Sequence, residues 1–351
     1  MLFNIEADHG AVISGYVVPD GFSGTPNIVV RNEGRDVLVR PADELRLALV
    51  SAGRHETGAC GFTIDEQAAP GLGGMEDLEI YDVESQILLY RRRRPHHIAR
   101  KVLRLESHLF PLWRLDAALN PRFQHSVNQI DNLGRETSTQ LFLLNLVDSA
   151  YVSGRIQYKN YSHYVESKYD VVFIMHHPLE ELAERLIVLA QIKKTGAGVL
   201  GMRDNLSLRS AMDFAQSLPF HDDRALGREL RNMPAGVAQI LANPVTRQLT
   251  TTTPDEMASG RAVSTALDIL ASFALVGLRR ASGTFARALA ELVGVPREDL
   301  PPLTKLPGVT ALAQSLKRSR AMEEILEQDI ELYHHIASAY RKSEPAKARA
   351  V

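Results

Sequence analysis

The chain has 351 residues, of which 45% are hydrophobic, and its formal net charge is −2. Such a charge argues against a general nucleic-acid-binding protein, which carries a strongly basic surface. The start, MLFNIEADHG, lacks the basic beginning and apolar core of a signal peptide, and no apolar run reaches the roughly 18 residues of a membrane span. We therefore expect a cytoplasmic protein with no membrane span and, at roughly 150 residues per domain, two domains. Its one cysteine, Cys60, excludes an intrachain disulfide and any multi-cysteine metal site.

Short strand-like runs separated by Gly, Pro, Asn and Asp fill residues 1–90. They cover residues 11–18, 27–31, 36–39, 61–65 and 78–90. The last of them, LEIYDVESQILLYRR, is typical of a β-hairpin. We expect an antiparallel β-sandwich over residues 1–90. Its segments GYVVPD, PNIVVRNEG and CGFTID resemble the accessory modules of some bacterial polysaccharide-synthesis enzymes.

The most basic segment, RRRRPHHIARKVLR, follows directly, and the apolar spacing of residues 98–113 predicts a helix behind it. Clustered guanidinium groups bind phosphate and sulfate oxygens in a bidentate manner. This segment therefore provides one candidate phosphate-binding cradle, made of Arg92, Arg93, Arg94, Arg100 and Lys101. The alternative is a solvated basic linker between domains.

A second candidate cradle lies in NLGRETSTQLFLLNL, residues 132–146, which reads as a loop entering a helix. Thr137, Ser138 or Thr139 can cap that helix, and the free N–H groups of a helix start attract anions. Arg135, Ser138 and Thr139 are the candidate contacts. The alternative is an ordinary N-cap, because the paired glycines and lysine of a nucleotide P-loop are missing.

The spacing of the hydrophobic residues changes halfway through residues 169–190. Val171–Met175 is a β-branched apolar run that predicts a buried strand, and Pro178 opens a segment with helical spacing. In open parallel sheets the carboxyl ends of strands face the ligand crevice, so the His176-His177 corner is a candidate site. The alternative is an ordinary crossover turn. Residues 205–342 read as helical, and residues 343–351 as a disordered tail.

Three separated pieces resemble the carbohydrate sulfotransferase family. They are the strand and corner at 169–190, the segment NPVTRQL with the later FALVGL, and the closing ILEQDIELYHHIASAYR. The resemblance implies an α/β domain over 91–342, with a P-loop-like parallel sheet flanked by helices. It also implies 3′-phosphoadenosine 5′-phosphosulfate (PAPS) as cofactor, no metal, and transfer of a sulfuryl group to a hydroxyl of a polysaccharide or glycolipid precursor.

Several positions depart from the family pattern. His176 replaces the arginine that holds the cofactor's 3′-phosphate, Glu181 replaces a second basic residue, and Glu184 replaces a helix serine. Carboxylates near a dianionic phosphate repel it. Two other functions therefore stay open: a non-catalytic glycan-binding or scaffold subunit of a polysaccharide-synthesis complex, and a transferase that uses a nucleotide sugar.

If the chain is an enzyme, in-line transfer needs a base near the acceptor hydroxyl. The candidates are His96, His97, Glu106 and His163; a histidine titrates near neutrality, whereas Glu106 would need a raised pKa. Under the same resemblance His176 and Arg247 hold the cofactor. The sequence leaves the oligomeric state open, and a homodimer is compatible with it.

Overall fold

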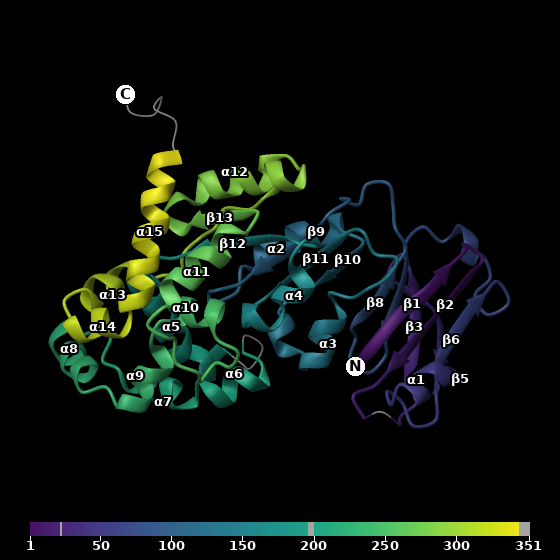
Figure 1. Ribbon diagram of the computed structural model, residues 1–351, viewed down its shortest axis with the longest axis horizontal. Coiled ribbons are helices and arrows are strands. Elements are labelled where there is room, and N and C mark those ends of the chain that lie inside the picture. Colours follow the sequence, from purple (N-terminus) through teal and green to yellow (C-terminus); the bar gives the residue numbers. More distant parts are fainter. Residues whose placement is uncertain (22, 196–199, 344–351) are drawn as a thin grey trace. The chain divides into compact units, whose positions relative to one another are not determined.

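The computed structural model describes residues 1–21, 23–195 and 200–343 of the chain (Figure 1). The expected tail at 343–351 therefore lies, from residue 344 on, outside the described residues. The chain divides into two compact units. The first unit comprises Met1–Leu103, Asp116–Ser153 and Tyr164–Tyr169, and the second comprises Arg104–Leu115, Gly154–His163 and the chain from Asp170 onward.

Two antiparallel sheets of four strands each form the amino-terminal part of the first unit. One has the order β1-β2-β6-β5 and the other β4-β3-β7-β8. The strands are β1 (Leu2–Asp8), β2 (Val12–Val18), β3 (Asn27–Asn32), β4 (Arg35–Pro41), β5 (Glu44–Leu45), β6 (Ala59–Asp65), β7 (Leu78–Asp82) and β8 (Leu88–Arg91). The predicted strands and the β7–β8 hairpin are confirmed, whereas β1 and β5 were not predicted.

A strand replaces the helix that was predicted over residues 98–113. β9 (Lys101–Leu105) has four consecutive buried residues, and helix α2 (Trp113–Leu119) begins only where the predicted helix ends. A strand buried on both faces has no period-two alternation, so its apolar run was mistaken for one face of a helix.

A five-stranded parallel sheet has the order β10-β11-β9-β12-β13 and is flanked by helices, which confirms the predicted α/β class. Its other strands are β10 (His125–Val127), β11 (Ala150–Gly154), β12 (Asp170–Met175) and β13 (Leu275–Leu278). The predicted strand, corner and helix at 169–190 are confirmed, because β12 is followed at Pro178 by α5 (Pro178–Thr195). In the second unit α5 packs against α7 and α13, and α12 lies along β13 (Figure 1).

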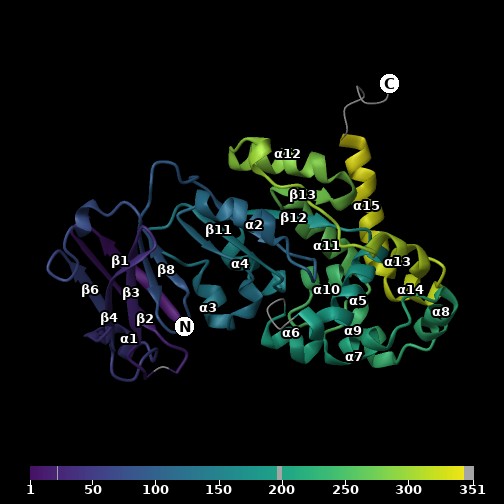
Figure 2. The same ribbon diagram turned by 180° about the vertical axis from the view of Figure 1, so that it is seen from behind.

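Helices dominate the chain after α5, as predicted. They are α6 (Met202–Ser207), α7 (Arg209–Ser217), α8 (Asp223–Arg231), α9 (Ala235–Leu241), α10 (Pro244–Thr250), α11 (Ala262–Ala271), α12 (Ser282–Val293), α13 (Val309–Leu316), α14 (Arg320–Ile325) and α15 (Glu327–Ser343). Figure 2 shows α8, α13 and α14 gathered together. The short helices α1 (Leu47–Ser51), α3 (Arg135–Gln140) and α4 (Ser162–Val165) precede them. Among the described helices, none combines the length and apolar character that crossing a bilayer demands.

The contact between β13 and α12 depends on a missing side chain. A Cβ atom built on Gly277 would lie 2.3 Å from Cδ2 of Phe285, a ring that is 1% exposed. We expect Gly277→Ala to lower the free energy of unfolding by about 1–3 kcal/mol, because the packed ring has to move. Urea denaturation measures the loss. Gly283→Ala is the matched control, since Gly283 has open space around its Cβ position; an equal loss in both variants would contradict the explanation.

The first unit contains a histidine that resists protonation. Burial lowers the pKa of His125 to about 4, and its Nε2 lies 2.9 Å from the Leu88 carbonyl oxygen while its buried Nδ1 has no partner. The stability that this neutral ring contributes is complete above pH 6.5 and is lost as the pH falls toward 4, by up to about 3 kcal/mol. We expect His125→Gln, measured by urea denaturation between pH 7 and 5, to lose less stability than the wild type. A parallel loss in both proteins would refute this assignment.

Candidate functional site

Polar side chains follow four neighbouring strands of the parallel sheet, at the point where each strand ends. Glu106 and His108 follow β9, Arg155 follows β11, His176 follows β12 and Arg279 follows β13. The residues at the ends of β12 and β13, Met175 and Leu278, are register partners, so His176 and Arg279 emerge side by side. Because the carboxyl ends of parallel strands meet at one edge, residues far apart in sequence form one cluster there. All of them belong to the second unit.

The carboxylate of Glu106 lies at the centre of this cluster and is 2% exposed. Its Oε2 accepts from Arg104 Nη1 at 2.5 Å and from the Leu112 backbone N–H at 2.9 Å. Its Oε1 lies 2.6 Å from His108 Nδ1 and accepts from the His108 backbone N–H at 3.1 Å. Burial alone would raise the pKa of Glu106, but the charge of Arg104 and the hydrogen bonds hold that pKa well below its usual range. Glu106 is therefore ionised and held from four directions.

The backbone of the loop after β9 is held as firmly as its side chains. Ser107 donates its hydroxyl to the Ile174 carbonyl oxygen at 3.2 Å, and Arg185 donates to the Ser107 carbonyl oxygen at 2.9 Å. The Glu106 carbonyl oxygen accepts from Gln248 Nε2 at 2.7 Å. These bonds join the loop to β12, α5 and α10. The position of His108 is thereby determined by three separate elements.

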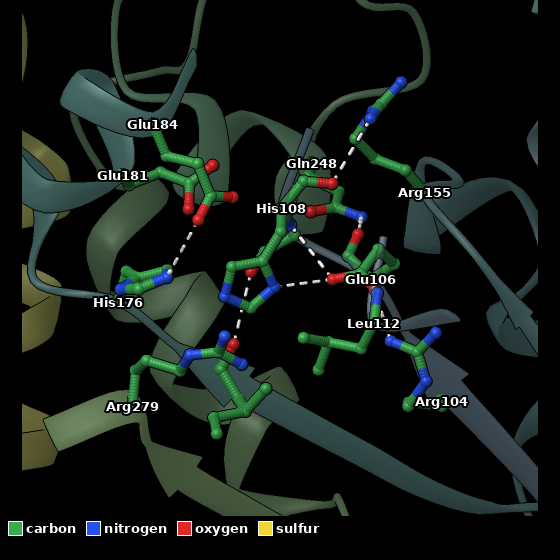
Figure 3. A network of polar contacts seen from close by, with 12 residues as sticks. Arg104, Glu106, His108, Leu112, Arg155, His176, Glu181, Glu184, Gln248 and Arg279 are labelled. Carbon is green, nitrogen blue, oxygen red and sulfur yellow. Dashed lines mark hydrogen bonds and ion pairs between the residues drawn. The ribbon is translucent and has the colours of Figure 1, made fainter. Parts of the chain in front are cut away.

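The two histidines of the cluster face each other. The rings of His108 and His176 lie with centroids 4.6 Å apart and planes at 75°. Since an ionised Glu106 accepts a hydrogen bond from Nδ1 of His108, the Nε2 atom of a neutral His108 ring carries the free lone pair. Figure 3 shows His108 between Glu106 on one side and His176, Glu184 and Arg279 on the other. His108 Nε2 is therefore the atom available to a ligand.

The first turns of α5 add carboxylates to the same place. His176 lies 3.6 Å from Glu180 through Nδ1 and 3.4 Å from Glu184 through Nε2. Burial would lower the pKa of His176, but the two carboxylates beside its ring raise that pKa. Glu181 accepts from Arg185 Nε at 2.9 Å, one helical turn along. The acidic residues after the corner are thus each provided with a nearby cation or imidazole.

An unusual number of buried polar atoms in the cluster have no hydrogen-bond partner. They are His108 Nε2, both ring nitrogens of His176, Glu181 Oε2, Glu184 Oε1, and Nε and Nη1 of Arg279. Each unpaired buried polar group costs about 1–3 kcal/mol, so such groups call for an ion, water or ligand. Nitrogen and oxygen atoms of His108, His176 and Glu181 lie within 4.8 Å of one another, which is compatible with a shared metal ion. The expectation of no metal did not consider this group, because it is assembled from distant segments.

A pocket of about 260 Å³ leads to the cluster. It is lined by the buried Glu184 and Arg279 of the cluster and also by Lys305 and the half-exposed Trp113. The rest of its lining is largely apolar and includes Phe110, Leu112, Pro302, Leu303 and Leu306. The pocket gives a small molecule a way to the buried polar atoms.

The arginine run of the first candidate cradle is engaged in contacts within the first unit. Arg92 pairs with Asp8 at 3.0 Å and also donates to the carbonyl oxygens of Leu72, Met75 and Gly10. Arg93 pairs with Asp148 at 3.4 Å, and Arg94 pairs with Asp77. These guanidinium groups brace loops against one another. The partners of these three arginines are carboxylates and carbonyl oxygens of the protein, so the run does not form a cradle around one shared anion.

The other first-unit candidates are also separate from the cluster. Arg100 and Lys101 stand at the amino end of β9, whereas Glu106 follows its carboxyl end. Ser138 and Thr139 donate their hydroxyls back to the carbonyl oxygens of Gly134 and Arg135. Helix α3 is capped by Gly134 without a side-chain bond, and Arg135 is exposed.

The candidate bases have environments unlike those expected for catalysis. Burial, with the charges of His96 and nearby arginines, lowers the pKa of His97 to about 4, and its Nδ1 accepts the Arg94 backbone N–H at 3.0 Å. His96 is exposed, and so is His163 on α4. Glu106 lacks the raised pKa that a base would need, as its pKa is lowered. Of the catalytic candidates, only Glu106 lies in the cluster, where it orients His108.

Arg247, the last cofactor candidate, holds backbone. Its guanidinium donates to the carbonyl oxygens of Gln239, Ala242 and Glu256, and its side chain is buried. His176, in contrast, lies in the cluster, as expected from its place at the corner that follows the predicted strand. Sequence reasoning missed Arg104, His108, Gln248 and Arg279. The alternation of Arg104, Glu106 and His108 at the end of a buried strand was the available signal.

Comparison with known proteins does not identify a family for this chain. No protein-family model matches the chain, and no curated protein matches its sequence. The function has to be argued from the site itself.

The pair Arg104–Glu106 supports a first test of the cluster. Glu106→Gln deprives a buried guanidinium of its carboxylate, and we expect the free energy of unfolding to fall by about 3–5 kcal/mol. Combining it with Arg104→Met removes both charges, so the double variant should lose less than the sum of the two single losses. Urea denaturation of the four proteins measures the coupling. Additive losses would show that the two groups are not coupled.

Proposed function

We propose that the second unit binds a divalent transition metal ion through His108, His176 and Glu181, and that the chain is a metal-dependent enzyme. One observation carries the proposal: possible ligand atoms of these three buried residues lie within 4.8 Å of one another, and each residue has a buried polar atom without a hydrogen-bond partner. Two imidazoles and a carboxylate are donors that suit Zn²⁺ and Fe²⁺. Zinc bound to three such ligands keeps a fourth position for water or substrate.

The distances suit such an ion after small side-chain rotations. Metal–ligand bonds of about 2.0–2.2 Å place tetrahedral ligand atoms roughly 3.4 Å apart. The cluster, at up to 4.8 Å, is slightly wider than that. Because Glu106 orients His108, the ligand atom Nε2 is already directed to the centre, and metal-binding histidines are commonly oriented in this way.

The charges of the cluster also favour a cation accompanied by an anion. Three carboxylates, Glu106, Glu181 and Glu184, are balanced by three guanidinium groups, those of Arg104, Arg185 and Arg279. Metal ligation requires both histidines to be neutral, and the cluster is then close to neutral. A divalent ion therefore adds positive charge that an anionic substrate can offset. A metal ion in this position would act as a Lewis acid on that substrate.

The PAPS-dependent transfer suggested by the resemblance is less well supported by these contacts. A phosphosulfate group would need the N–H groups of a loop that follows a strand. After β9, the N–H groups of His108 and Leu112 already donate to the Glu106 carboxylate. Titration with 3′-phosphoadenosine 5′-phosphate remains the direct test of that alternative, and tight binding would favour it over the metal centre.

Metal binding to the chelator-treated protein tests the proposal. We expect one equivalent of Zn²⁺ to bind in a calorimetric titration and to raise the melting temperature, because a ligand at 100 times its Kd stabilises by about 2.7 kcal/mol. His108→Ala and His176→Ala should both lose this binding and the stabilisation. Loaded wild-type protein should hydrolyse a chromogenic phosphate, sulfate or carboxylate ester, and chelation should stop the reaction.

His335→Ala is the matched control, because His335 is an exposed histidine of the same unit. It should bind Zn²⁺ as the wild type does. A wild-type protein that binds neither Zn²⁺ nor Fe²⁺, or histidine variants that bind as well as the control, would refute the metal centre. Binding without hydrolysis of any ester would limit the proposal to metal binding.

A further inference from the structure

Arg279 presents a guanidinium group whose hydrogen-bonding capacity is only partly used. Its Nη2 donates to the Thr304 carbonyl oxygen at 2.6 Å, while its Nε and Nη1 are buried without an acceptor. The residue is only 5% exposed, yet it lines the same pocket as Trp113. Buried donors left unpaired are destabilising, and more so when they carry charge. A ligand that enters the pocket can supply the missing acceptors.

The unused N–H groups of Arg279 and its positive charge define the kind of acceptor. Nε–H and the N–H groups of Nη1 point in different directions, so each needs an acceptor atom of its own. Hydrogen bonds from a guanidinium are strongest to the oxygens of an ionised carboxylate, phosphate or sulfate group, and weaker to a neutral hydroxyl or carbonyl. The unused donors therefore favour an oxyanion.

The apolar lining defines the rest of the ligand. Trp113 is 50% exposed at the pocket, and the Arg114 guanidinium lies over its ring at 5.1 Å. Prolines and leucines provide the other walls. A flat ring would cover the indole and remove this apolar surface from water. At about 260 Å³ the pocket is smaller than the roughly 300–1,000 Å³ typical of drug-sized ligands, so one ring with an acidic substituent is a suitable size.

We propose that this pocket binds a ring-bearing oxyanion, with an oxygen of the acidic group hydrogen-bonded to the Arg279 guanidinium and the ring against Trp113. If the ring-bearing oxyanion is the substrate of the metal centre, this inference rests on the proposed function. The binding of such a compound in the pocket rests only on Arg279, Trp113 and the pocket itself. The acidic group would lie between Arg279 and the metal ligands, where one oxygen reaches the guanidinium and another reaches the metal ion.

Three other charged side chains line the pocket, Glu184, Lys305 and Arg114, and they bear on its preference for anions. Glu184 would repel an anion, but its Oε2 lies 3.4 Å from His176 Nε2, so the carboxylate is turned toward an imidazole. Lys305 adds a positive charge and pairs with Glu180 at 2.7 Å. The anion therefore approaches from the side of Arg279 and Lys305.

The chain offers its own probe of this site, because Trp113 is its one tryptophan. Fluorescence titrations with phenylphosphonate, benzenesulfonate and benzoate compare the acidic groups on the same ring, and none of these compounds can be hydrolysed as an ester. Methylphosphonate, which lacks the ring, measures how much the ring contributes to binding. We expect a saturable change of Trp113 fluorescence, with phenylphosphonate binding at least about tenfold more tightly than methylphosphonate.

Arg279→Met should weaken the binding of the preferred ring compound by at least about tenfold, because a charged hydrogen bond contributes roughly 1.5–3 kcal/mol. Arg279→Lys, which keeps the charge but loses the paired donors, should recover only part of it. Arg280→Met is the matched control: it removes the next arginine, which is exposed and lies over the Tyr333 ring at 5.8 Å, and it should bind as the wild type does.

Running each titration with and without Zn²⁺ separates this inference from the metal centre. Binding that depends on Arg279 in the absence of metal supports the pocket even if no metal binds. Metal binding without any response of Trp113 to the four compounds overturns the pocket and leaves the metal centre standing. Equal binding by the Arg279→Met and Arg280→Met variants also overturns it, and retained Zn²⁺ binding by Arg279→Met shows that the variant is folded.

Discussion

An ionised carboxylate without access to water is the constraint on which the cluster depends. Burying such a charge is costly unless it is paired and fully hydrogen-bonded. Glu106 meets that condition through Arg104, through two backbone N–H groups and through Nδ1 of His108. The last contact has a chemical result as well as an energetic one. It orients the His108 ring, so that Nε2 faces His176 and the carboxylates of α5.

The parallel sheet makes this arrangement possible. Its strands end at one edge, and the residue after each strand is delivered to the same small volume. His176 and Arg279 arrive there next to each other because β12 and β13 are register partners up to their last residues. The result gathers histidine ring nitrogens without hydrogen-bond partners and N–H donors of Arg279 without acceptors. The cation and the anion that we propose would together satisfy both sets.

Local sequence signals predicted most of the elements but little of the site. The strand, proline corner and helix at 169–190 follow from the change of period at Pro178, and the predicted antiparallel strands are confirmed for the same reason. β9 was mistaken for a helix, since Val102 and Leu103 are buried on opposite faces and the alternation disappears. β1 was missed although Phe3 and Ile5 alternate with Asn4 and the strand is as long as β2.

The sequence by itself determined the α/β class, the strand-corner-helix around His176 and the concentration of basic and acidic residues. Those properties are encoded by neighbours along the chain. The tertiary structure alone decided which distant charges meet: Arg92 pairs with Asp8, and Lys305 pairs with Glu180. It also decided that His108 lies beside His176. Ion pairs and ligand sets of this kind depend on strand order and on burial, and neither is contained in the spacing of residues along the chain.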